Sequence, residues 1–456
     1  MIRNTKSFHL KVACQALTAA AAWHAGSALA APSLDESYVR ASQEQNGKHV
    51  IVVEGSGFGE KKQAAPVLLD RVESTYENGA ENLWAVSKQS GDPVLRPEAD
   101  PTVPYAKSST EIWSKTHLRF DASNDQRSSS SKQQYYFPGG GGYAGWPRAY
   151  GGNDGTATPV DDKKIYVAWW YKPLYSPNSF WLLPNTGVQG TFVDGETVTV
   201  GEYKATFIGV DSDDKINLVF QNSATPSSAQ LIGQTIRGTE SNASLTFPSR
   251  DYGTPGSQKY IRIWEDPNGR EGIRFSWTQM HQTFADTTGE NNGGAYVNWS
   301  AAPIEGGKWH LLEVQMDTGK GEATLRVNTQ TVTKINFDPK LAAAGKWSPT
   351  IGLVGLDGKS GRLQKNWLDD IYFDNSFQRV VLGNAPAYDQ VTHYELQRPT
   401  SWKDDRIEFV AFKGGLKSLD QSYIYVFDEN GLVNQQGIQV CSGCKAPPSP
   451  VNLRIK

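Results

Sequence analysis

Residues 47–59, GKHVIVVEGSGFG, are the segment from which the fold can be worked out. Apolar and polar residues alternate along it, and it closes on a glycine-rich turn. Such alternation is typical of a strand with one buried face. More than 300 residues later, residues 399–410 (PTSWKDDRIEFV) and 422–431 (SYIYVFDENG) supply further alternating strands. Isolated two-stranded ribbons are marginal in water, so we expect these distant pieces to join into one small β-domain.

The glycine-rich end of the first segment, residues 55–59, resembles the opening of an IPT/TIG (immunoglobulin-like) domain. Residues 402–410 and 423–427, with the turn that follows them, resemble that family's continuation. The resemblance implies a sandwich domain split between residues 33–60 and 388–440. The rest of the chain between them is then an insertion.

The insertion contains many short alternating strands, and long helical periodicities are nearly absent. Clear strands are expected at residues 165–172, 259–264, 272–281, 308–316, 323–328, 350–356 and 367–374. The order of a Trp-His-x-x-Glu-Val strand, a strand ending in Asn and a late Asp-Asp-Ile-Tyr-Phe strand resembles the concanavalin A-like sandwich. That superfamily includes laminin G-like modules, legume-type lectins, glycoside hydrolases and polysaccharide lyases. The resemblance implies a jelly roll built from residues 62–189 and 248–385.

Residues 190–247 break this pattern. Two similar stretches, at residues 192–201 and 231–238, each precede a further strand. We interpret the segment as a small β-barrel inserted into a loop of the sandwich, because loop tips tolerate insertions. The predicted fold class is therefore all-β: a jelly-roll sandwich, an inserted barrel and an Ig-like sandwich formed from both termini.

The first 30 residues predict a secretory signal peptide. Basic residues open it, residues 12–22 are apolar, and Ala28-Leu29-Ala30 supplies a cleavage site. The apolar run is too short to span a bilayer, and we find no other candidate span. We expect an exported protein in the periplasm, at the cell surface or outside the cell.

Cys441 and Cys444 lie in a Cys/Pro-rich tail, residues 441–456. In an oxidising compartment this Cys-Ser-Gly-Cys spacing predicts a local disulfide. A redox motif would need a strand-to-helix setting, and zinc would need two more ligands.

The net charge of the chain restricts which binding partners are expected. Asp and Glu total 48 against 45 Lys and Arg, for a formal net charge of −3. A mildly acidic chain argues against nucleic acid or anionic lipid as a partner. A polysaccharide or cell-surface glycan is the expected ligand, with self-assembly left open.

Strand alternation selects the candidate ligand-binding residues, because every second residue shares a face. Aromatic and polar side chains opposite apolar ones would line a wetted groove. The predicted ligand-binding residues are Trp170, Lys172, Arg262, Trp264, Trp277, Glu313 and Gln315. His310 falls with the apolar set and is expected to be packed.

Gln279-Met280-His281 resembles the Gln-x-His motif of alginate-lyase-type sandwich lyases. The resemblance implies that Gln279 neutralises a uronate carboxylate while His281 and a tyrosine move protons. Tyr260 is the first choice for that tyrosine, with Tyr166 and Tyr372 as alternatives. The family's Arg-x-Glu and Tyr-x-Lys-x-Gly motifs are missing, which puts this role in doubt.

The sequence gives less support for other kinds of catalytic or metal site. The paired carboxylates of sandwich glucanases are absent, and no nucleophile, zinc or nucleotide motif is present. No cofactor is expected, although Asp369, Asp370 and Asp374 could bind calcium instead of serving as strand-end turn residues. We therefore predict a non-catalytic carbohydrate-binding or extracellular structural protein. The alternatives are a polysaccharide lyase and a structural protein without a ligand.

Overall fold

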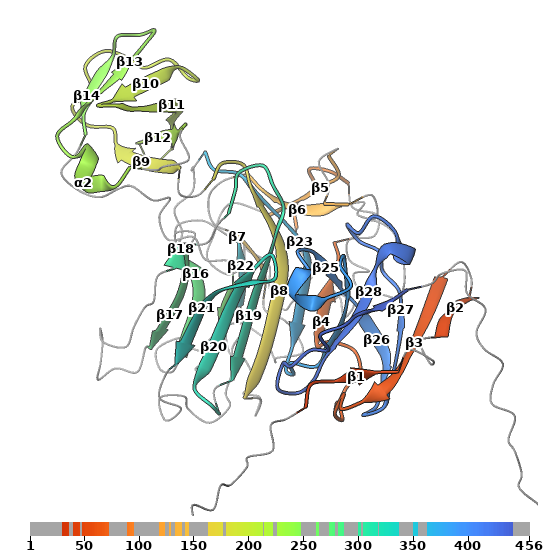
Figure 1. Cartoon of the computed structure of the whole chain (residues 1–456). Helices are drawn as coiled ribbons and strands as arrows, with labels where there is room; N and C mark the ends of the chain where they lie inside the picture. Colours follow the sequence, from red (N-terminus) through yellow and green to blue (C-terminus); the bar gives the residue numbers. More distant parts are fainter. Residues whose placement is uncertain are drawn as a thin grey trace, which may run out of the picture.

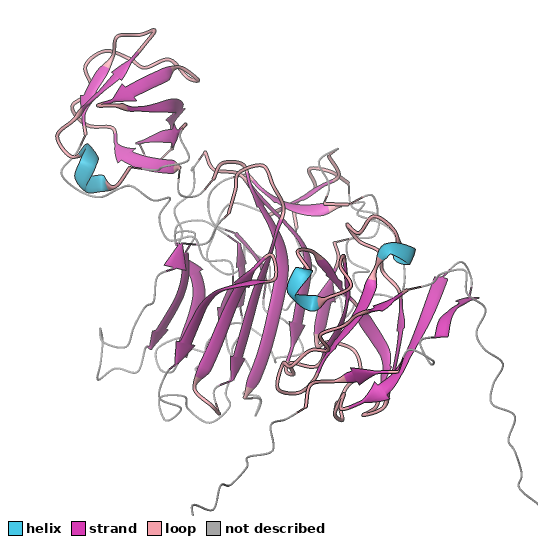
Figure 2. Ribbon diagram, viewed as in Figure 1, coloured by secondary structure: helices cyan, strands magenta, loops and turns pink. Residues whose placement is uncertain are grey.

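The protein is described here from a computed structural model. It covers residues 30–35, 40–45, 48–72, 89–94, 118–123, 127–128, 133–138, 142–145, 163–176, 179–212, 214–221, 226–247, 261–263, 273–278, 281–286, 300–301, 304–317, 319–336, 350–353 and 363–440. Strands dominate these residues (Figure 2), so the predicted all-β class is confirmed. The helices described are single short turns at Ser228–Leu231 (α2), Tyr388–Gln390 (η6) and Leu419–Gln421 (η7). Among the described residues, no helix has the length and apolar character needed to cross a membrane.

An eight-stranded antiparallel sheet, called the central sheet, organises the molecule. Its strands run in the order β21-β20-β19-β8-β23-β6-β5, and β4 pairs with β23. The bounds are β21 Gln330–Asn336, β20 Glu322–Val327, β19 His310–Asp317, β8 Lys164–Pro173, β23 Asn366–Asp374, β6 Gln134–Phe137, β5 Arg119–Asp121 and β4 Leu68–Asp70.

Strand β8 explains why this sheet is central. Its sequence KIYVAWWYKP is apolar at consecutive positions, which is typical of a strand buried on both faces. Every residue after Lys164 is buried. Trp169 and its alternate neighbours join one hydrophobic core, and Tyr166, Ala168 and Trp170 join another.

A six-stranded sheet, called the outer sheet, lies beside strands β19 to β21 of the central sheet (Figure 1). Its order is β18-β17-β16-β15-β22-β7. The bounds are β18 Ser300–Ala301, β17 His281–Asp286, β16 Ile273–Thr278, β15 Ile261–Ile263, β22 Thr350–Leu353 and β7 Gly142–Gly145.

The two ends of the chain share one five-stranded sheet. Strand β3 (Lys48–Ser56) pairs with β27 (Arg406–Val410), and Ile51 lies opposite Phe409. The remaining strands are β1 Ser33–Leu34, β2 Arg40–Gln45 and β26 Arg398–Trp402. Figure 1 shows red N-terminal and blue C-terminal strands side by side.

A four-stranded sheet completes the layers. It consists of β25 Tyr394–Leu396, β24 Arg379–Gly383, β28 Tyr423–Phe427 and β29 Ile438–Gln439. One face of it packs on the five-stranded sheet through residues such as Val380 and Ile407. Its other face packs on the central sheet through residues such as Tyr394 and Tyr425. The central sheet is therefore covered by apolar contacts on both sides.

The inserted module is a sheet of order β14-β13-β10-β11-β12-β9 with its own hydrophobic core. Its bounds are β9 Phe180–Pro184, β10 Thr197–Val200, β11 Tyr203–Val210, β12 Lys215–Phe220, β13 Thr235–Gly238 and β14 Ser244–Thr246. It begins at Phe180, earlier than residue 190, because β9 pairs with β12. A bridge between Gln189 and Ser244 brings its two ends together.

One segment that was predicted to be a single strand forms two strands. Residues 272–281 were expected to form a single strand, yet β16 ends at Thr278 and β17 begins at His281. Thr278 pairs with His281, so the chain reverses direction between them. Alternation within one strand does not carry across such a turn.

The close approach of β1 to β3 gives a stability prediction. A Cβ at Gly55 would overlap the carbonyl oxygen of Ser33 and lie 2.7 Å from Cζ of Phe58. Overpacking of this kind costs about 1–3 kcal/mol, so Gly55→Ala should lower the free energy of unfolding by that amount. Urea denaturation measures the change, with Ser56→Ala as the control at the exposed neighbouring position. Equal stability of the two variants would contradict the β1–β3 pairing.

Candidate functional site

A buried ionic cluster lies between the central sheet and the four-stranded sheet. Arg127 Nη1 donates to Oε1 of Glu395 at 2.7 Å, and Nη2 donates to Asp370. Its Nε lies 3.5 Å from Oδ2 of Asp369. The guanidinium also lies 4.9 Å from the ring of Trp170. We call these five residues the Arg127 cluster, and it joins strands β8, β23 and β25.

Charges and backbone groups around Glu395 hold it ionised. Burial by itself would raise its pKa, but Arg127 and the hydrogen bond from His393 outweigh burial and lower the pKa to about 2. Gly415 N also donates to Oε1 at 2.7 Å. Glu395 is therefore an acceptor for several groups and not a proton donor near neutral pH.

The three aspartates considered for calcium face cations of the protein itself. Asp369 and Asp370 face Arg127, and Asp374 Oδ2 lies 2.6 Å from Nζ of Lys61. Asp369 and Asp370 lie within β23 at a register shift, whereas Asp374 is the last residue of that strand. Burial raises the pKa of Asp374 to about 6 despite Lys61. Among the described residues, no three potential ligands are grouped so as to hold a metal ion.

A second buried cluster surrounds Glu313. Tyr166 donates its hydroxyl to Oε1 of Glu313 at 2.8 Å, and Tyr394 donates to the same oxygen. The guanidinium of Arg379 lies 3.9 Å from the ring of Tyr166 and 3.5 Å from that of Phe427. Burial and then the Glu313 carboxylate raise the pKa of Tyr166.

Three residues of the central sheet that were predicted to line a ligand-binding groove are buried, so the prediction is wrong for them. Trp170, Lys172 and Glu313 are 5%, 1% and 0% exposed. The four-stranded sheet covers the face that strand alternation had marked as wetted. Gln315, on the same strand as Glu313, is half-buried and accepts a hydrogen bond from Arg326 at 3.4 Å.

Burial also excludes two of the tyrosines that were considered as proton carriers in a lyase reaction. Tyr166 and Tyr372 are 0% exposed, and burial raises the pKa of both. By contrast, His310 is packed as predicted, with 4% of its surface exposed. Its ring nitrogens contact Glu305 and Asn328.

The remaining predicted residues belong to the outer sheet or to its surroundings. Tyr260, Trp264 and Gln279 lie outside the described residues, as do the signal peptide and Cys441 with Cys444. Arg262 is opposite Ser276, and Trp277 is the next position along β16. Opposed residues share a face, so positions 262 and 277 fall on opposite faces.

The strand register also places His281 of the Gln-x-His motif and Trp277 on opposite faces of the outer sheet. His281 is opposite Thr278 and therefore shares the face of Arg262, not that of Trp277. The predicted row of Trp277, Gln279 and His281 on one strand is wrong, because the chain turns before His281.

A polar and aromatic row lies at the β5 end of the central sheet, and sequence reasoning had named only one of its residues, Lys172. Arg119, Tyr136, Trp367 and Lys172 stand opposite one another on β5, β6, β23 and β8. We call these four residues the Tyr136 row. Arg119 is exposed, Tyr136 and Trp367 are half-buried, and only Lys172 is buried.

The row is held rigidly. The rings of Tyr136 and Trp367 lie 5.3 Å apart, and Nζ of Lys172 lies 4.5 Å from the Trp367 ring. Asp121 accepts hydrogen bonds from Nε1 of Trp367 at 2.8 Å and from Gln134 at 3.1 Å. Because the ring faces are partly in contact, the row offers ring edges, the Tyr136 hydroxyl and the Arg119 guanidinium to a ligand.

A sequence signal for this row exists, but it is weak. Tyr136 and Trp367 each lie half-buried between buried neighbours on their strands, and nothing along the chain brings residues 119, 136 and 367 together. Only strand pairing does so.

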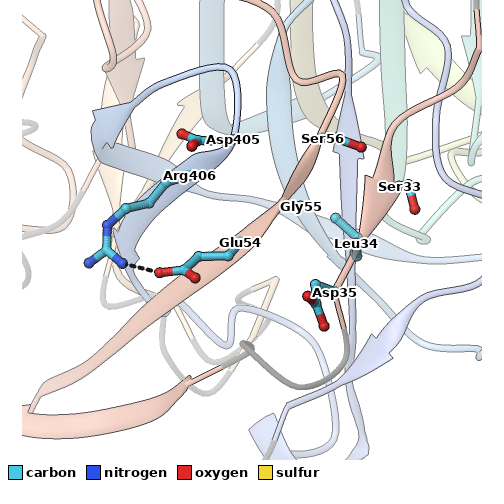
Figure 3. Close-up of a pocket in the computed structure, with 8 residues that line it drawn as sticks. All are labelled: Ser33, Leu34, Asp35, Glu54, Gly55, Ser56, Asp405 and Arg406. Atoms are coloured by element: carbon cyan, nitrogen blue, oxygen red, sulfur yellow. Dashed lines mark hydrogen bonds and ion pairs between the residues drawn. The ribbon is translucent and has the colours of Figure 1, made fainter. Parts of the chain in front are cut away.

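A cavity of about 580 Å³ lies on the five-stranded sheet (Figure 3). It is lined by Ser33, Leu34, Asp35, Glu54, Gly55, Ser56, Asp405 and Arg406. Arg406 Nη1 donates to Glu54 at 2.6 Å, and both side chains are partly exposed. The lining includes three carboxylates and one arginine, and it lies where β1 and β3 meet the start of β27.

Comparison with known proteins gives only distant likenesses. No protein-family model and no curated protein match the sequence. A heptameric SAP-like pentraxin from Limulus polyphemus aligns with 8% identity and a TM-score of 0.20, over 56% of this chain and 86% of the pentraxin. A glycoside hydrolase family 131 catalytic domain from Coprinopsis cinerea aligns with 9% identity and a TM-score of 0.25, over 68% and 94%. Arcelin-5, a lectin-like defence protein from Phaseolus vulgaris, gives 8% and 0.23 over 58% and 95%. TM-scores this low carry no argument about function.

The Arg127 cluster gives a pH prediction. The pKa of Glu395 is lower in the folded protein than the ordinary value of 4.5. Its ionised form therefore stabilises the fold above about pH 4.5, and this contribution of about 3 kcal/mol is lost as the pH falls towards 2. Glu395→Gln should destabilise strongly at pH 7 and much less at pH 3, measured by urea denaturation against the unmodified protein.

Asp389→Asn is the control, because Asp389 is an exposed acid on η6. A Glu395→Gln deficit that stays constant between pH 7 and pH 3 would contradict the role assigned to this carboxylate.

Proposed function

We propose that this protein is an exported, non-catalytic carbohydrate-binding protein that contacts its glycan through the Tyr136 row. The observation that carries the proposal is the register that aligns Arg119, Tyr136 and Trp367 on adjacent strands. Export follows from the predicted signal peptide, and the IPT/TIG-like and concanavalin A-like domains remain part of the proposal.

The chemistry of the row suits a sugar. Half-buried aromatic side chains supply apolar contact, while hydroxyl, guanidinium and carboxylate groups hydrogen-bond hydroxyls. Strands are spaced about 4.8 Å apart, so the three strands that carry Arg119, Tyr136 and Trp367 present a row of roughly 10 Å, enough for a short oligosaccharide. The bonds from Trp367 and Gln134 to Asp121 fix the geometry before a ligand arrives. Preorganisation of this kind reduces the cost of binding.

The described residues do not support the alternative that the protein is a polysaccharide lyase. Tyr166 and Tyr372 are buried and hydrogen-bonded to carboxylates, so they have no access to a polysaccharide. His281 begins a new strand instead of sharing one with Gln279. A structural role remains compatible with the packed layers, and it needs no ligand at all.

Binding can be tested on a glycan array with the mature protein. Tyr136→Ala and Trp367→Ala should weaken binding to the best glycan roughly tenfold or more, because each removes aromatic contact worth about 1–2 kcal/mol. Tyr203→Ala is the matched control, since Tyr203 is a half-buried tyrosine of the inserted module. Circular dichroism checks that each variant is folded. Binding that survives both row variants would refute the proposed site.

Catalysis is tested separately by incubating the protein with uronate polymers and recording ultraviolet absorbance of unsaturated products. We expect no increase. An increase that disappears in His281→Ala would establish the lyase instead.

A further inference from the structure

Trp309 lies in line with the Tyr136 row, on the side of Lys172 away from Trp367. It immediately precedes β19, and His310, the first residue of that strand, is opposite Tyr171 of β8. By the same antiparallel register, Trp309 faces Lys172. Nζ of Lys172 lies 5.2 Å from the ring of Trp309 and 4.5 Å from that of Trp367. The two indole rings therefore share one ammonium group.

The turn before Trp309 is fixed against β8 and the residues that follow it. Gly307 N donates to the carbonyl oxygen of Pro173 at 2.7 Å, and Gly306 N donates to Oγ of Ser176 at 2.8 Å. The backbones approach so closely that a Cβ at Gly306 would lie 2.5 Å from the backbone nitrogen of Ser176. Trp309 itself is half-buried. Its position is thus set by the turn, while part of the side chain reaches the surface.

With Trp309 added, the side chains that reach the surface follow a line across the strands. Arg119, Tyr136 and Trp367 come first, and Trp309 follows beyond the buried Lys172. We call these five residues the extended row. Five adjacent strands spaced about 4.8 Å apart make the line roughly 19 Å long. Recognition of a single terminal sugar needs groups that converge on one point, whereas separate contacts along a line suit an internal stretch of a chain.

We propose that Trp309 is a second aromatic contact for the glycan, and that the extended row binds an internal stretch of a polysaccharide chain. The inference rests on the proposed function for the ligand being a glycan, and it adds a binding residue and the length of chain that is recognised. The Tyr136–Trp367 ring pair and the Trp309 ring contact different sugar units of one chain. Linked contacts of this kind raise affinity as the chain lengthens, until it spans the row.

The test uses oligosaccharides of defined length, from disaccharide to hexasaccharide, prepared from the polysaccharide that binds best on the glycan array. Isothermal titration calorimetry gives the affinity for each length. Affinity of the unmodified protein should rise from the disaccharide to the longer chains. Trp309→Ala should weaken hexasaccharide binding roughly tenfold, as expected for the loss of one aromatic contact, and should change disaccharide binding little.

Two control variants accompany Trp309→Ala. Trp309→Phe keeps an aromatic ring and should retain most of the hexasaccharide affinity. Tyr203→Ala on the inserted module should have no effect at any length. Disaccharide binding that is kept in Trp309→Ala shows that this variant is folded.

Three results overturn the inference: unchanged hexasaccharide affinity in Trp309→Ala, a loss in that variant that is equal at every length, or an unmodified protein that binds all lengths equally well. If one of these occurs while Tyr136→Ala and Trp367→Ala still weaken binding, the proposed function stands and this inference fails. If no glycan on the array binds at all, the proposed function itself fails.

Discussion

Burial of both faces of the central sheet is the constraint on which the rest of the structure depends. Strand β8 has nine consecutive buried residues, so apolar layers must cover it on two sides. The four-stranded sheet from the C-terminal part of the chain covers one side, and the core that contains Trp169 lies on the other. The other face of the four-stranded sheet packs on the five-stranded sheet, in which β3 pairs with β27.

Covering a partly polar face has an electrostatic consequence. Buried charges are tolerated only when they are paired and hydrogen-bonded. Arg127 meets three carboxylates, Lys61 meets Asp374, and Glu313 receives two phenol hydroxyls. These groups have the composition of a catalytic site, yet their partners are all internal. Their bonds join the central sheet to the four-stranded sheet, through Arg127 with Asp370 and Glu395 and through Glu313 with Tyr394.

Ligand contact is then confined to surfaces that the cover does not reach. The Tyr136 row lies at the β5 end of the central sheet, where Arg119 is exposed and the two rings are half-buried.

The sequence by itself determined the all-β class, the joining of residues 47–59 to residues 399–410, and the inserted module, because strand alternation and turn residues are local signals. It also determined that His310 is packed. The prediction that Trp170, Lys172 and Glu313 face solvent was wrong, because strand alternation identifies a polar face but does not show which other layer covers it. Its row through Trp277 and His281 failed because the chain reverses direction between Thr278 and His281, which pair with each other. Only the tertiary structure decided which strands lie opposite each other, and hence that Arg119, Tyr136 and Trp367 share one row. Pairing between residues far apart in the chain depends on the packing of whole layers, which no local pattern encodes.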